Sequence, residues 1–181
     1  HINYAFVHID DNWEASIGNP SNPANPATGM TWPGVTGAEM DPEYSFNGHF
    51  NLLNKYKKQY PHVKTMISVG GWAETGGYFD DDGTRVANGG FYEMTKTQAK
   101  IDTFADSCVD FIRTYGFDGV DIDYEYATSM NQAGNPDDFW LSDTLRGTLW
   151  AQYDLLMKTL RTKLDAAGQA DGTHYLLTVA A

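Results

Sequence analysis

The chain has 181 residues, 41% hydrophobic and 14% aromatic, a composition typical of a globular protein with one core. No apolar run approaches the ~20 residues that a membrane helix needs, and a formal net charge of −12 disfavours nucleic acid and anionic membrane surfaces as partners. The single cysteine, Cys108, excludes an internal disulfide and a cysteine-rich metal site, and the five histidines show no metal-ligand spacing. We therefore expect no metal or other cofactor, no nucleic-acid partner and no membrane partner.

Predicted strands and helices alternate along the whole chain. The predicted strands lie at residues 1–9, 63–69, 118–125 and 175–181. The predicted helices lie at residues 41–60, 95–115 and 149–168. Repeated strand-loop-helix units predict an α/β fold with about four parallel strands and the helices outside the sheet. Because the chain begins and ends inside predicted strands, we expect it to be part of a larger unit.

Particular residues mark the predicted helix ends. Asp41 followed by Pro42 has the acceptor cap and first-turn proline of a helix start. Thr95 and Gln98 have the spacing of a capping box for the second helix, and Gly116 is expected to end that helix in a left-handed conformation.

Three long loops follow the predicted strands, over residues 10–40, 73–94 and 126–145. Connections of this length are usually functional or disordered, and α/β enzymes place their sites at the C-terminal ends of parallel strands. Within the second loop, residues 80–82 are three consecutive aspartates. They lack the alternating ligands of a calcium loop, so we expect a solvated turn there.

The third predicted strand carries acids at every second position, Asp121, Asp123 and Glu125. Alternate strand residues share one face, so the three carboxyl groups are expected in one row. If the row is buried, its like charges predict that at least one acid keeps its proton near neutrality, as an acid/base enzyme requires. The alternative is a half-exposed strand with its acids in water. The absence of Lys and Arg from residues 115–132 disfavours that alternative.

Two motifs make the chain resemble the family 18 glycoside hydrolases, a group that includes many chitinases. The family pattern DxxDxDxE matches the segment 118–125, and the pattern SxGG matches Ser68, Gly70 and Gly71. The resemblance implies a TIM barrel, which typically needs about 250 residues. The predicted strands resemble the second to fifth of that barrel. Residues 1–181 are thus expected to be a partial catalytic (β/α)8 barrel domain, with the remainder in the same or a second chain.

The resemblance implies roles for the acidic residues. Glu125 is expected to be the general acid and later base, Asp123 to orient the substrate's acetamide, and Asp121 to share a proton with Asp123. Asp118 differs in parity from these acids, and an interior hydrogen-bonding role and a structural role are both open for it. Ser68 is expected to donate a hydrogen bond to Asp121, although a plain strand serine is equally compatible with the sequence.

The expected substrate-binding residues are Trp72, Tyr126, Phe6 and Gly71. Aromatic residues in a barrel more often pack than bind, so binding is favoured for Trp72 and Tyr126 at strand ends, and more weakly for Phe6. Gly71 allows close approach of the backbone to a ligand, although a tight turn would also require it.

The resemblance implies a chitinase that cleaves β-1,4-linked N-acetylglucosamine polymers within the chain, with retention, through an oxazolinium ion. One alternative is an endo-β-N-acetylglucosaminidase acting on glycoprotein glycans, and another is a non-catalytic chitin-binding lectin. Such lectins typically lack the proton donor, so Glu125 argues against the lectin. Ala127 and Tyr124 depart from the proline and tryptophan common in chitinases. Secretion is expected from the family alone.

Overall fold

The computed structural model describes residues 1–180. The strands are β1 (Ile2–Ile9), β2 (Ala15–Ser16), β3 (Thr65–Gly70), β4 (Tyr78–Phe79), β5 (Arg85–Val86), β6 (Gly119–Asp123) and β7 (Leu176–Val179). The helices are α1 (Gly48–Gln59), α2 (Gly90–Met94), α3 (Gln98–Tyr115), the short 3-10 helix η1 (Pro136–Asp138), α4 (Phe139–Leu145) and α5 (Leu149–Asp171). No helix in this part of the chain has the length and apolar character needed to cross a membrane.

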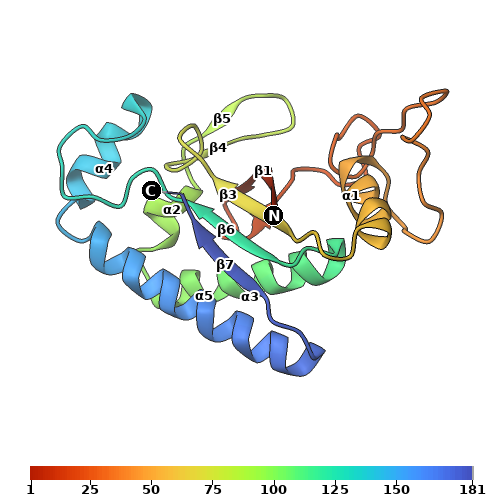
Figure 1. Cartoon of the computed structure of the whole chain (residues 1–181). Helices are drawn as coiled ribbons and strands as arrows, with labels where there is room; N and C mark the ends of the chain where they lie inside the picture. Colours follow the sequence, from red (N-terminus) through yellow and green to blue (C-terminus); the bar gives the residue numbers. More distant parts are fainter. Residues whose placement is uncertain (181) are drawn as a thin grey trace.

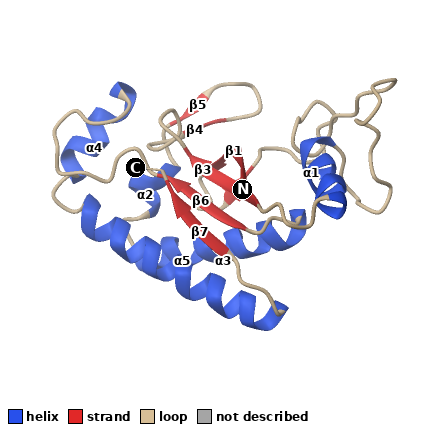
Figure 2. Cartoon of the chain, in the orientation of Figure 1, coloured by secondary structure: helices blue, strands red, loops and turns tan. Residues whose placement is uncertain are grey.

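The main sheet has the strand order β2-β1-β3-β6-β7. Strands β1, β3, β6 and β7 run parallel to one another. The two-residue β2 pairs antiparallel with the end of β1. Helices α3 and α5 lie side by side along one face of the sheet, while the β4–β5 hairpin and α4 lie beyond the C-terminal strand ends (Figures 1 and 2). The predicted α/β fold with four parallel strands is confirmed.

The core lies between the sheet and these two helices, and β6 shows how alternation divides its side chains. Val120 and Ile122 are fully buried among apolar residues of the helices, among them Phe104 and Leu156. Cys108 of α3 is 1% exposed in the same core. Alternate strand residues point to opposite faces, so Asp121 and Asp123 face away from the helices.

The ends of α1 differ from the prediction. The helix begins at Gly48, whereas Asp41-Pro42 precedes it in a turn. The Asn51 side chain accepts a hydrogen bond from the Asp41 N–H at 2.8 Å and donates one to the Asp41 carbonyl oxygen at 2.9 Å. These contacts hold the backbone of Asp41 against the finished helix, so it does not form the first turn.

The ends of α3 and α5 agree with the prediction only in part. Gly116 ends α3 in the left-handed conformation, as predicted, with φ 73°. The N-cap of α3 is Thr97 and not Thr95, because the Thr95 hydroxyl donates to the carbonyl of Phe91 and belongs to the end of α2. Helix α5 continues past Gly168 and is capped by Gly172, and the expected loop 126–145 contains η1 and α4.

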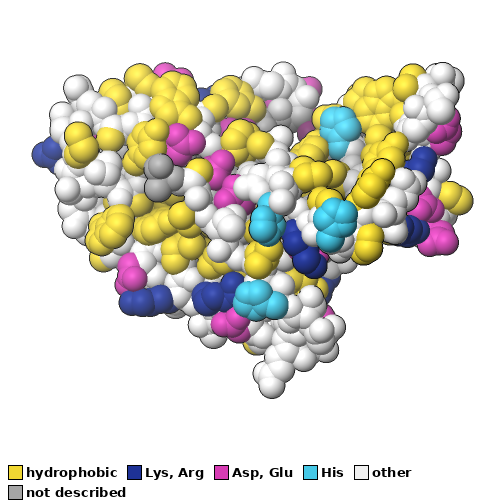
Figure 3. Space-filling model, viewed as in Figure 1, with side chains coloured by type: hydrophobic (Ala, Val, Ile, Leu, Met, Phe, Trp, Pro, Cys, Tyr) yellow, Lys and Arg dark blue, Asp and Glu magenta, His cyan; other side chains and the backbone are white. Residues whose placement is uncertain are grey.

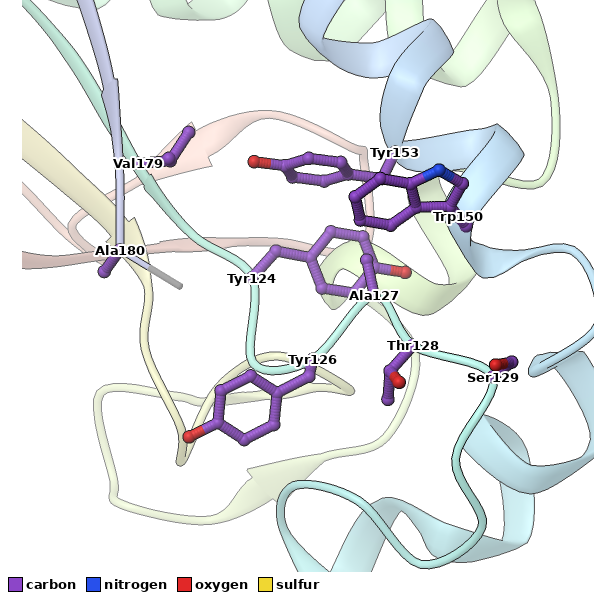
Figure 4. A pocket seen from close by; sticks show the side chains of 9 residues that line it. All are labelled: Tyr124, Tyr126, Ala127, Thr128, Ser129, Trp150, Tyr153, Val179 and Ala180. Atoms are coloured by element: carbon purple, nitrogen blue, oxygen red, sulfur yellow. The ribbon is translucent and has the colours of Figure 1, made fainter.

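The parallel sheet is open at both flanks. On β1, Ile2 is 45% and Phe6 49% exposed. Beside β7, a groove of about 550 Å³ is lined mainly by apolar and aromatic side chains, and Figure 4 shows Trp150 and Tyr153 of α5 on one side of it and Val179 on the other. Hydrophobic side chains also gather in this region of the surface (Figure 3). Four parallel strands therefore leave apolar surface on view that a closed barrel would cover.

Candidate active site

Asp121 lies at the centre of a polar row that crosses the sheet. Its carboxylate accepts hydrogen bonds from Asn3 Nδ2 at 2.8 Å, Ser68 Oγ at 2.7 Å and Thr178 Oγ1 at 2.6 Å. The three donors lie on β1, β3 and β7, and the register pairs Ser68 and Thr178 directly with Asp121. The hydrogen bond expected from Ser68 is present. Asp121 is only 5% exposed, and the three donors fix the orientation of its carboxylate.

Asp123 lies one alternation further toward the C-terminal end of β6 and is 8% exposed. Within the described residues its Oδ1 atom has no hydrogen-bond partner. Burial, and after it the negative charge of Asp121, raises the pKa of Asp123 to about 6. A buried oxygen without a hydrogen-bond partner destabilises the folded state. For Asp123 this penalty is larger when the carboxyl group is ionised. Within the row, Asp123 is the acid whose pKa is raised toward neutrality.

Glu125 does not belong to the strand, which corrects the expectation of three acids on one regular element. β6 ends at Asp123, and Glu125 lies half-buried in the turn that follows. Its backbone N–H donates to Thr75 Oγ1 at 3.0 Å. The next residue, Tyr126, lies beside it, and hydrogen bonding to the Glu125 carboxylate raises the pKa of Tyr126. Asp121, Asp123 and Glu125 therefore follow one another toward the open C-terminal end of the sheet.

Asp118 lies at the opposite end of the same strand. Its carboxylate contacts Lys57 Nζ at 2.6 Å and Lys64 Nζ at 3.1 Å, and it accepts a hydrogen bond from the Thr65 N–H at 2.9 Å. Burial alone would raise the pKa of Asp118, but the hydrogen bonds from the two lysines and from the Thr65 backbone outweigh burial and lower it. These contacts match the structural role left open by the sequence.

We expect Asp118→Asn in the full-length protein to lower the free energy of unfolding by about 1–3 kcal/mol at pH 7, because partly buried charge pairs are lost. The folded-state pKa is depressed, so this contribution is present above the unfolded pKa near 4 and is lost as pH falls through the folded value. Urea unfolding at pH 7 and pH 3 measures it, and the difference between variant and wild type should be smaller at pH 3. Equal stability at pH 7, or a large loss of turnover in the folded variant, would contradict the structural role.

Three aromatic side chains near the acids are exposed, Phe6 at 49%, Trp72 at 47% and Tyr126 at 39%. The ring of Phe6 covers Gly71, whose φ is 78° and where an added Cβ would lie 2.9 Å from Phe6 Cζ. Gly71 therefore accommodates the Phe6 ring, a different reason for glycine from the expected approach of a ligand. Phe6, Trp72 and Tyr126 are therefore accessible from solvent, as sugar binding requires.

The acidic turn in the second long loop forms as expected. Asp80 Oδ1 accepts hydrogen bonds from the backbone N–H groups of Asp82 and Thr84, at 3.0 and 2.8 Å. Across residues 1–180, no cluster of three or more His, Cys, Asp or Glu side chains is placed to hold a metal ion.

The model of glycosyl hydrolases family 18 matches residues 1–181. The chain belongs to this family. It is 36% identical to Chitinase A1 of Niallia circulans, over 99% of this chain and 26% of that protein. Among solved structures it is similar to a family GH18 chitinase from Chromobacterium violaceum, with 57% identity and a TM-score of 0.96, over 99% of this chain and 27% of that one. It is also similar to chitinase ChiA74 from Bacillus thuringiensis, with 28% identity and a TM-score of 0.72, over 99% and 30% of the two chains. The chain thus spans under a third of the length of these relatives.

Sequence reasoning missed several residues of this family 18 chain that contact the acids. Asn3 and Thr178 bind Asp121, and Thr75 binds the backbone of Glu125. Thr178 alone had a usable signal, because it lies on the final predicted strand at a position that alternation can place on the inner face. Asn3 and Thr75 have no local pattern that sets them apart.

Proposed function

We propose that residues 1–181 are part of the catalytic (β/α)8 barrel domain of a chitinase. The observation that carries this proposal is the buried pair Asp121 and Asp123, with Glu125 beyond it, at the C-terminal end of a parallel sheet in a family 18 chain. The exposed apolar side chains of β1 and the groove beside Trp150 support the proposal of a larger domain, because further parts of a barrel would cover these surfaces. The rest of the barrel is expected in the same or a second chain.

The isolated stretch of 181 residues is expected neither to fold stably nor to hydrolyse chitin. Its open parallel edges and exposed apolar faces leave too little surface buried. Thermal unfolding followed by circular dichroism should show no cooperative transition, in contrast to the full-length protein. A soluble, cooperatively melting 181-residue chain would refute this expectation.

Hydrolysis of a glycoside requires a proton for the leaving oxygen and stabilisation of an oxocarbenium-like carbon. In the proposed mechanism Glu125 gives its proton to the leaving sugar oxygen. The substrate's own N-acetyl oxygen attacks the anomeric carbon, and an oxazolinium ion forms as the glycosidic bond breaks. Glu125 then removes a proton from the water that opens this ion. Two inversions at one carbon give net retention.

The same mechanism gives roles to the buried carboxyl groups of Asp121 and Asp123. Asp123 accepts a hydrogen bond from the acetamide N–H and balances the positive charge of the oxazolinium ion. Its unpartnered Oδ1 supports this assignment, because a buried acceptor is available there. In this mechanism Asp121, held by its three donors, shares a proton with Asp123. The pair thereby supplies negative charge where the reaction develops positive charge.

The proposed substrate is a β-1,4-linked N-acetylglucosamine polymer, cleaved within the chain, with Phe6, Trp72 and Tyr126 as sugar-stacking surfaces and secretion as the matching location. Incubation of the full-length protein with chitin oligosaccharides should release β-anomeric products, seen by NMR. Products with the α-anomer would exclude retention.

An endo-β-N-acetylglucosaminidase acting on glycoprotein glycans would use the same residues. One structural neighbour, at 28% identity and a TM-score of 0.61, is a family 18 N-acetylglucosaminidase from Paenibacillus barengoltzii, which keeps this alternative open. Products from chitin oligosaccharides and from a high-mannose glycoprotein separate the two activities. A chitin-binding lectin would bind without releasing products, and the presence of Glu125 favours hydrolysis.

A further inference from the structure

Thr75 connects the loop after β3 with the turn after β6. The residue is fully buried. Its Oγ1 accepts a hydrogen bond from the Glu125 N–H at 3.0 Å and donates one to the Gly71 carbonyl oxygen at 2.9 Å. A buried hydroxyl that both accepts and donates is oriented from two sides. Thr75 therefore holds Glu125 at a fixed distance from Gly71.

Glu125 depends on such contacts because the sheet does not hold it. β6 ends at Asp123, and the chain then turns between Tyr124 and Tyr126 (Figure 4). On either side of Glu125, the Asp123 carbonyl accepts from the Gly71 N–H at 2.9 Å, and the Tyr126 N–H donates to the Tyr92 hydroxyl at 3.3 Å. Thr75 is the side chain that contacts the backbone of Glu125 itself.

Thr75 is fixed in turn by groups on both sides of it. Its carbonyl accepts from the Phe91 N–H at 2.7 Å. The next N–H, that of Gly76, donates to Asp138 Oδ2 at 3.1 Å, and Asp138 is only 2% exposed. Arg85 of β5 pairs with the other oxygen of Asp138 and donates to the Ala73 carbonyl at 2.6 Å. Removing one partner of such a buried ion pair is costly, so these contacts stabilise the loop that carries Thr75.

We propose that Thr75 is a positioning residue for Glu125, and that the Arg85–Asp138 pair keeps Thr75 in place. This inference rests on the proposed role of Glu125 in proton transfer. Proton transfer to the leaving oxygen demands a carboxyl group within hydrogen-bond reach of it. A displacement of about 1 Å at such a group can cost about 10²-fold in rate. The hydroxyl of Thr75 sets the backbone from which that carboxyl group extends.

The test compares Thr75→Val, which keeps the shape and removes the hydroxyl, with Thr75→Ser, which keeps the hydroxyl. In the full-length protein Thr75→Val is expected to lower kcat on chitin oligosaccharides about 10- to 100-fold, with KM changed less than about 3-fold. Thr75→Ser should retain at least about a third of kcat. Thr75→Val should lose less on an aryl glycoside with a nitrophenol leaving group, because that group needs less protonation. A general loss of structure would affect both substrates equally.

Glu125→Gln, measured in parallel, separates failure of this inference from failure of the proposed function. If Glu125→Gln is inactive while Thr75→Val turns over normally, only the positioning role is overturned. Equal losses in the Val and Ser variants also overturn it, because the hydroxyl is then not the cause. Normal turnover in Glu125→Gln removes both proposals. If Thr75→Val does not fold, Thr75→Ala takes its place in the same comparison with Thr75→Ser.

Discussion

Replacement of Glu125 by Gln in the full-length protein is expected to lower turnover of chitin oligosaccharides by about 10²- to 10⁴-fold, the usual contribution of a general acid. Gln keeps the size of Glu and one of its acceptor oxygens, but its amide cannot act as a general acid. The backbone contact with Thr75 does not involve the side chain, so the variant should fold normally. Steady-state turnover and calorimetric binding of the oligosaccharide, measured on the same preparation, check the two expectations.

Glu43→Gln is a matched control, because the Glu43 side chain is 77% exposed on the surface and lies outside the proposed site. We expect its turnover within about 2-fold of wild type, since exposed ion pairs contribute little. Near-normal turnover in Glu125→Gln would end the proposed mechanism. Loss of binding together with turnover would assign Glu125 to substrate binding and not to proton transfer.

Asp123→Asn is expected to lower turnover by about 10²-fold, similar to the loss of one electrostatic contact to a developing charge. It should also weaken discrimination between N-acetylated and deacetylated sugars, because the charge that balances the oxazolinium ion is gone. Rates on chitin and on chitosan oligosaccharides of equal length measure this ratio. Asp154→Asn, a change at an exposed carboxylate on α5, serves as the control. Unchanged discrimination would remove the acetamide role from Asp123.

Asp123→Asn also tests the raised pKa of Asp123, through the pH dependence of the free energy of unfolding. Because the folded-state pKa of Asp123 is raised to about 6, its contribution to wild-type stability is full below the unfolded pKa near 4 and is lost as pH rises through about 6. Asp123→Asn has no such group. The stability of wild type relative to Asp123→Asn should therefore fall between pH 4 and pH 8, as urea unfolding measures. A difference that does not change with pH would contradict the raised pKa.

Alternation within one strand made the orientation of β6 predictable. Val120 and Ile122 lie in the core and Asp121 and Asp123 on the opposite face, because side-chain period is a property of the strand alone. The same alternation predicts that Asp118, three positions before Asp121, does not share the face of the other acids. Its contacts indeed lie at the other end of the strand.

Features that depend on distant parts of the chain were not predictable in the same way. Asn3 meets Asp121 across 118 positions of sequence, and only the sheet register brings them together. The true start of α1 depends on Asn51 binding back to Asp41, which outweighs a favourable local pattern. The end of β6 at Asp123 has no composition signal, so Glu125 was assigned to a strand that had already ended.

The two ends of the segment 118–125 have different roles. The lysine contacts of Asp118 stabilise the amino end, whereas the acids proposed for the reaction lie at the other end, where a buried oxygen of Asp123 has no partner among residues 1–180. Under the proposed mechanism, a mutation at Glu125 is therefore expected to abolish the reaction while the contacts of Asp118 stay intact. Under the proposed function, a descendant that has lost Glu125 would keep the fold that presents its exposed aromatic residues, which offers a short evolutionary route from a hydrolase to a carbohydrate receptor.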